Sequence, residues 1–156
     1  MEREFGLMIR RIAASHEANP SLAEDLVQDI WLALWRALPS FREQSSLRTF
    51  VARIATFRAI THARDGARHP RPTAMPEDLP APEPGPEQHA ITRDRQAKLV
   101  TAMRALPLPL RQVALLTLEG LAPQDIAAVL GITANAVAIR LSRAREALRS
   151  QLGEGP

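Results

Sequence analysis

The stretch PQDIAAVLGITANAVAIRLSRAREALRSQL, residues 123–152, decides the fold class of this chain. A first helix is predicted to begin at Pro123, because the fixed φ of proline suits a first helical turn. Gly131 interrupts the pattern, and a long second helix is predicted from about Ala134 to Leu152. Two helices joined by a short turn that contains glycine are typical of a helix-turn-helix unit.

The second of these helices carries an excess of arginine, with four arginines against a single acid, Glu146. Apolar side chains at helical spacing predict its inward face: Val137, Leu141, Ala144 and Leu148. Asn135 and Ala138 should then face outward, where a helix-turn-helix presents its base-reading side chains and flanking arginines hold phosphates. A solvated arginine face that complements the C-terminal helix dipole is the alternative.

The whole composition also indicates a nucleic-acid partner. Nineteen of the 20 basic residues are arginine, and residues 90–156 carry nine basic against five acidic side chains. The planar guanidinium suits phosphates and base edges. A GC-rich coding sequence would enrich arginine as well, so composition alone leaves both explanations open.

A proline-rich segment divides the chain. Seven of its 13 prolines fall between Pro70 and Pro86. Proline at this density lacks the N–H donors that helices and sheets need, so residues 65–89 are expected to form an extended, flexible linker. The flanking units, 1–64 and 90–156, are small enough to be marginal alone, and we expect both to work while docked on something larger.

The N-terminal unit is predicted to be helical throughout. Helices are expected from about Glu4 to His16, through LAEDLVQDIWLALWRAL (22–38), and from about Leu47 to His62. Ser21 and Glu24 form a capping-box pattern before the second helix. Two buried faces are predicted from spacing: Leu22, Leu26, Ile30, Leu34 and Leu38 on the second helix, and Phe50, Ile54, Phe57 and Ile60 on the third.

The C-terminal unit adds two helices before the helix-turn-helix, from about Ile91 to Leu106 and from Arg111 to Glu119. The predicted fold class is therefore all-α, with two small helical domains joined by a proline-rich linker.

Composition excludes several classes of function. The chain has no cysteine, which excludes disulfides, thiolate zinc sites and cysteine nucleophiles. Its four histidines lack metal-ligand spacing, and no glycine-rich phosphate loop or serine nucleophile elbow occurs. No apolar run approaches a membrane span, and the start lacks a signal-peptide core. We expect a cytoplasmic protein that is not an enzyme and needs no metal or cofactor.

Trp31 and Trp35 lie four residues apart on the helix 22–38, which also carries an acidic cluster near its start. Aromatic side chains at this spacing can simply belong to the core, and the acids can complement the helix dipole. An apolar stripe with two indoles and an acidic shoulder would equally suit docking to helices of another protein.

Two stretches resemble bacterial RNA polymerase sigma factors. AEDLVQDIWLALWRALPSFREQSSLRTFVARIA (23–55) resembles their second conserved domain, and LPLPLRQVALLTLEGLAPQDIAAVLGITANAVAIRLSRAREALRSQL (106–152) resembles their fourth. The order of the two stretches and the linker between them match the small extracytoplasmic-function (ECF) type of the sigma-70 superfamily. The resemblance implies sigma domain 2 at 1–64, a linker at 65–89 and sigma domain 4 at 90–156.

The resemblance also implies three binding surfaces. A surface for the coiled coil of the core polymerase β′ clamp would comprise Asp25, Gln28, Asp29, Trp31 and Trp35. A surface that reads and melts the −10 promoter element would comprise Phe41, Ser45, Ser46, Leu47, Arg48, Phe50, Arg53 and Arg58. The −35 element would be read by Thr133, Asn135, Ala138, Arg140 and Arg143. The polymerase β flap and an anti-sigma factor are further implied partners.

The implied function is promoter-specific transcription initiation, in which the reaction itself belongs to the polymerase. Phe50 stands where the family often has tryptophan, and Ala138 and Ile139 stand where Lys-Ser or Lys-Thr is frequent, so the promoter sequence is left open. A polymerase-independent helix-turn-helix regulator and a protein-interaction adaptor remain as alternatives. The stretch AEDLVQDIWLALW together with SLRTF favours a sigma factor, because a simple repressor has no reason to carry it.

Overall fold

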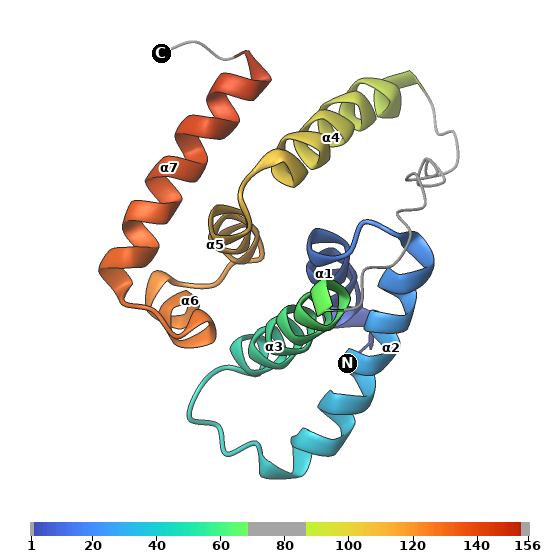
Figure 1. Cartoon of the computed structure of the whole chain (residues 1–156), viewed down its shortest axis with the longest axis vertical. Helices are drawn as coiled ribbons and strands as arrows, with labels where there is room; N and C mark the ends of the chain where they lie inside the picture. The colour runs from blue at the N-terminus through green and yellow to red at the C-terminus, as the bar shows by residue number, and fades with distance from the viewer. Residues whose placement is uncertain (1, 69–86, 154–156) are drawn as a thin grey trace.

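The computed structural model describes residues 2–68 and 87–153, and every regular element in these ranges is a helix. The N-terminal unit contains α1 (Glu2–His16), α2 (Pro20–Ala37), the 3₁₀ turn η1 (Leu38–Ser40) and α3 (Leu47–Arg68). The C-terminal unit contains α4 (Glu87–Ala105), α5 (Leu108–Leu118), α6 (Pro123–Leu130) and α7 (Ala134–Leu152). Figure 1 shows these two groups of helices, and the all-α prediction is confirmed.

The predicted linker is only partly within the described ranges. Helix α3 continues to Arg68 and α4 begins at Glu87, so both ends of the segment 65–89 are helical rather than extended. Helix α3 therefore runs six residues beyond the predicted end at His62. Residues 69–86, on which the prediction of a flexible tether rests, lie outside the described residues.

Helix α2 starts differently from the prediction. The side chain of Asn19 accepts hydrogen bonds from the backbone N–H groups of Ser21, at 2.9 Å, and Leu22, at 3.3 Å. Pro20 then occupies the first turn. Asn19 is thus the N-cap, and the capping box predicted from Ser21 is wrong because a better acceptor stands two residues earlier.

The predicted buried face 22–38 is confirmed at its centre, where Leu26, Ile30 and Leu34 are fully buried, whereas Leu22 and Leu38 at its two ends are half-buried.

Helix α3 turns to the core a face that only partly matches the predicted one, since Phe50 and Ile54 pack against the core but Phe57 does not. Phe57 was predicted to be buried, yet 66% of it is exposed. The buried positions carry small side chains instead, with Ala52, Ala55 and Ala59 at no measurable exposure. Because α3 packs against both α1 and α2, small residues at the contact allow the three axes to approach closely.

The helix-turn-helix forms as predicted. Helices α6 and α7 bend by 102° relative to one another, within the range of this motif. Gly131 ends α6 at φ +68°, in the left-handed region that glycine adopts without steric cost. Val137 and Ala144 of α7 are fully buried, and Leu141 and Leu148 pack against the core. Helix α5 begins at Leu108, before the predicted Arg111, with Pro109 in its first turn.

The two units pack against each other, α1 on α5 and α3 on α6. Arg111 of α5 donates hydrogen bonds across the junction to the carbonyl oxygen of Ser15, and within its own unit to Leu106 at 2.9 Å. The side-chain amide of Gln112 lies 3.2 Å from the Nε2 atom of His16. Each unit is too small to cover its own hydrophobic core completely. The other unit supplies part of that cover.

His16 should make the stability of this junction depend on pH. Burial lowers the pKa of His16 below its ordinary value of 6.5; the hydrogen bond with the Ile12 carbonyl oxygen opposes this shift, and the nearby Arg111 and His62 add to it. Because the unfolded chain binds the proton more readily, stability should be fully present above about pH 6.5 and fall as the pH drops below it. Urea unfolding of the wild type and of His16→Gln between pH 5 and 7.5 measures this.

The His16→Gln variant should show a smaller loss of stability on acidification than the wild type. His62, which pairs with Glu17 at 2.9 Å, is the same residue in both proteins. Identical pH dependence in the two proteins would contradict the assignment to His16.

Two glycines provide a matched test of backbone conformation. Gly131→Ala should destabilise the protein by about 1–2 kcal/mol, because an alanine there must adopt the left-handed region. Gly66→Ala, inside α3 with open space around it, should stabilise by about 0.5–1 kcal/mol. Chemical denaturation of both variants measures the two signs, and equal effects would show that the turn conformation is unimportant.

Candidate functional site

The outer face of α2 collects polar side chains and one indole. Asp25, Gln28 and Asp29 are exposed, as predicted for a binding surface. Trp35 is 77% exposed, whereas Trp31 is half-buried and packs against the core. The two tryptophans therefore differ in accessibility. Of the two, Trp35 has the exposed side chain that could contact a partner protein. Leu32, which the sequence analysis did not single out, is also exposed on this helix.

The surface on α2 adjoins the candidate DNA-contacting helix α3. Arg58 of α3 lies 3.9 Å from a carboxylate oxygen of Asp29, and both side chains are well exposed. A pair so exposed contributes little to stability and separates readily. The structure thus brings together one member of the predicted clamp surface and one member of the predicted −10 surface.

The loop before α3 is anchored at both ends. The rings of Phe41 and Phe50 contact each other in a tilted arrangement with centroids 4.8 Å apart. Ser46 accepts a hydrogen bond from the backbone N–H of Thr49 at 3.1 Å and donates one to its hydroxyl oxygen at 2.9 Å. Between these anchors residues 42–45 are exposed, and Glu43 has φ 55°. An aromatic pair beside an exposed polar loop can stack on an unpaired base.

The remaining members of the predicted −10 surface separate into two groups. Arg53 is exposed and Ser45 lies in the exposed loop, whereas Leu47 packs against the core. The side chain of Arg48 is 43% exposed and reaches the other unit. Its Nη1 atom donates to the carbonyl oxygen of Glu119 in the other unit, at 2.8 Å.

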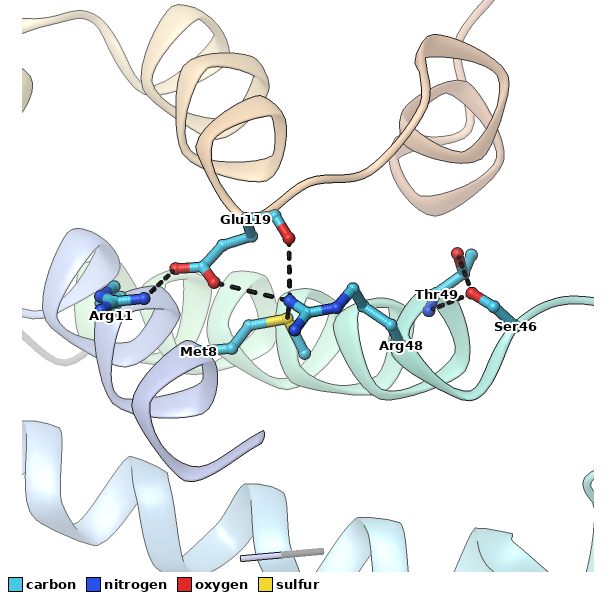
Figure 2. A network of polar contacts seen from close by, with 6 residues as sticks. All are labelled: Met8, Arg11, Ser46, Arg48, Thr49 and Glu119. Carbon is cyan, nitrogen blue, oxygen red and sulfur yellow. Dashed lines mark hydrogen bonds and ion pairs between the residues drawn. The ribbon is translucent and has the colours of Figure 1, made fainter. Parts of the chain in front are cut away.

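Glu119 is the residue that sequence reasoning missed. It follows the end of α5, and its side chain is only 6% exposed. One carboxylate oxygen accepts from Arg11 at 3.0 Å, and the other lies 3.8 Å from Arg48, as Figure 2 shows. These partners are 108 and 71 residues away in sequence, so no local spacing could have indicated the cluster. We call Arg11, Arg48 and Glu119 the Glu119 junction.

The outer face of α7 presents the predicted −35 residues. Asn135, Ala138 and Arg143 are exposed, and Arg140 is half-buried. The hydroxyl of Thr133 accepts a hydrogen bond from the backbone N–H of Ala136 at 3.0 Å and caps the helix, so it is partly occupied. Ile139 is exposed beside Ala138. This face offers one amide for a base edge, two apolar side chains for thymine methyls, and arginines for phosphates.

A pocket of about 560 Å³ lies between α1, α4 and α5. Its walls are mainly apolar, with Leu99, Met103 and Leu115 among them, and Arg11 and Arg104 also line it.

In the two described ranges, no group of three acidic or histidine side chains is placed to hold a metal ion. No single helix there is long and apolar enough to cross a membrane, although the bent pair α6–α7 passes on length and composition.

Comparison with known proteins matches both units to one family. The family described as Sigma-70 region 2 matches residues 3–69, and the family described as Sigma-70, region 4 matches residues 96–148. The RNA polymerase sigma factor NccH of Alcaligenes xylosoxydans xylosoxydans is 30% identical over 159 residues, which cover 96% of this chain and 83% of NccH. The ECF RNA polymerase sigma factor SigE of Mycolicibacterium smegmatis is 31% identical, over 97% of this chain and 60% of SigE.

A solved structure has the same arrangement of helices. The structure of CnrH in complex with the cytosolic domain of CnrY matches with a TM-score of 0.65 and 26% identity, over 99% of this chain and 86% of that one. A polymerase-independent regulator and an adaptor are not favoured, because both units match the same family in its order. This chain therefore belongs to the sigma-70 family of RNA polymerase sigma factors, as a member of the ECF group.

Proposed function

We propose that this sigma factor binds core polymerase through α2, melts the −10 element with the loop 41–46 and α3, and reads the −35 element with α7. An anti-sigma factor is proposed as its inhibitory partner, on the likeness to CnrH, which was solved with CnrY. One observation supports the proposal: both family regions occur in one chain, and exposed side chains that could meet a partner lie on α2 and on α7.

The proposal for α2 rests on a combination of exposed groups. Trp35 provides a large apolar contact, while the exposed Asp25, Gln28 and Asp29 supply acceptors two to three turns earlier on the same helix. Buried aromatic anchors with a polar rim are the usual source of binding energy in protein interfaces. An acidic rim would favour a basic partner surface.

The loop 41–46 and α3 are proposed to act on single-stranded DNA. Taking a base out of the stack costs a few kcal/mol, and an aromatic platform beside a polar loop offsets part of that cost. Phe41 and Phe50 supply the platform, and the exposed Arg53 supplies a charge for the backbone phosphate.

The surface on α2 can be tested by charge reversal. Asp25→Arg combined with Gln28→Arg should abolish assembly with purified core polymerase, because both exposed side chains would then repel a basic surface. Size-exclusion chromatography of the mixture measures assembly, and circular dichroism checks that helicity is intact.

A matched control is available on α4. Asp94→Arg with Gln96→Arg makes the same chemical change at exposed positions outside the proposed surface and should leave assembly unaffected. Normal assembly of the α2 double variant would refute the assignment of α2.

Arg143 is proposed to contact phosphate rather than a base, because the outward side chains beside it are apolar. Arg143→Ala should weaken binding of the holoenzyme to many promoter sequences about equally and lower the slope of log affinity against log salt by about one unit. Promoter binding at several salt concentrations measures the slope.

Arg149→Ala serves as the control for this experiment. It removes the same charge near the C-terminal end of α7, the end distant from Asn135 and Ala138, and should leave the slope nearly unchanged. A changed sequence preference in Arg143→Ala, with the wild-type slope, would instead indicate a base contact.

A further inference from the structure

We propose that Phe57 of α3 is a second stacking platform for unpaired bases of the melted promoter. The melted strand runs along one face of α3, over a line of four side chains that we call the α3 track: Phe50, Arg53, Phe57 and Arg64. The proposal rests on the proposed function of α3 and deepens it, because it extends the surface for single-stranded DNA beyond the exposed loop. Neither the spacing of apolar residues nor the resemblance to sigma factors assigned a binding role to Phe57 or Arg64.

The exposure of Phe57 excludes a role in the core. Phe57 is 66% exposed, whereas the positions of α3 that face α1 and α2 carry small side chains. Phenylalanine also has a lower helix propensity than alanine, so the ring does not stabilise the helix locally. A single exposed apolar side chain is common on protein surfaces, and its neighbours decide what it can bind.

The neighbours of Phe57 on this face are arginines and a second aromatic ring. The four positions of the α3 track are spaced by three, four and seven residues, so they share one face of the helix. Arg53 and Arg64 are exposed, like Phe57. Phe50 lies nearest the start of α3, where its ring contacts that of Phe41 with centroids 4.8 Å apart. The α3 track is therefore continuous with the aromatic pair beside the exposed loop.

The charge of this helix favours a nucleic acid over other ligands of an exposed ring. Residues 47–64 include four arginines and no acidic residue. Two of these arginines lie against acidic side chains of other helices. The other two, Arg53 and Arg64, belong to the α3 track, one before and one after Phe57. Aromatic rings that stack on bases, set among cations that hold phosphates, are the usual means of binding a single strand.

The spacing of the two rings predicts which bases they hold. Phe50 and Phe57 are seven residues apart, which is about 10 Å along the helix axis. Stacked nucleotides rise by about 3.4 Å each along a strand. The two platforms are therefore about three nucleotides apart, and the base on Phe57 is a different one from the base beside the loop.

The experiment uses holoenzyme assembled from purified core polymerase and the full chain. Its probe is a promoter that the wild-type holoenzyme selects from a random pool, prepared with one strand of the −10 region unpaired, each strand in turn. An abasic site replaces each unpaired base in turn, and the affinity is measured for every probe. The wild type should lose affinity at two positions about three nucleotides apart.

Phe57→Ala should weaken binding to the unmodified probe by about tenfold. At one of the two sensitive positions the abasic site should then cause no further loss, because the ring that held the missing base is gone. Phe57→Trp retains an aromatic face and should bind like the wild type, whereas Phe57→Leu should bind as weakly as Phe57→Ala. Leu7→Ala is the control, since it removes a side chain that is 63% exposed on α1, and it should change nothing.

A second variant tests the far end of the α3 track. Arg64→Gln should lower the slope of log affinity against log salt by about 0.7 unit, the value for one phosphate contact on a single strand. Arg10→Gln removes an exposed arginine of α1 and should leave the slope unchanged. An unchanged slope in Arg64→Gln would exclude Arg64 from the α3 track.

The outcomes separate this proposal from the proposed function. If the losses caused by Phe57→Ala and by every abasic site simply add, stacking on Phe57 is refuted. If Phe57→Ala fails to assemble with core polymerase, the ring contacts protein and the α3 track is also refuted. If the wild-type holoenzyme binds the unpaired probe no better than core polymerase alone, the proposed function of α3 fails. If the wild type binds it and Phe57→Ala binds equally well, that function stands and only the α3 track fails.

Discussion

The small size of each helical unit is the constraint on which the rest of the structure depends. A unit of about 60 residues buries only about 60% of the surface that its unfolded chain exposes. In this protein the buried side chains of both units form one continuous cluster, from Phe5 of α1 to Ala144 of α7. The contact of α1 with α5 therefore completes two cores at once, and polar groups such as Arg111 fix its geometry.

Charged side chains lie beside this apolar contact. The buried carboxylate of Glu119 adds charge-assisted contacts to two half-exposed arginines. Glu119 receives both partners from across the junction, and neither arginine is far from solvent.

The candidate surfaces were predictable to different degrees. The face of α7 followed from a 3.6-residue spacing, and Asn135, Ala138 and Arg143 are exposed as expected. The exposure of the predicted clamp-binding surface on α2 agrees with the sequence only in part, since Trp35 is exposed while Trp31 packs against the core. Arg48 was assigned to DNA on a resemblance, yet it donates to the other unit. The contacts that the sequence did not predict depend on how elements meet, which spacing along one helix does not reveal.

The sequence by itself determined the helices, the turn at Gly131 and the division into two units, because these depend on local backbone preferences. Proline density, the left-handed conformation of glycine and the repeat of apolar residues all act within a few positions. Only the tertiary structure decided that alanines rather than Phe57 of α3 face the core, and that Glu119 meets Arg11 from 108 residues away. Such contacts arise where two surfaces fit, and that fit depends on the shapes of both units together.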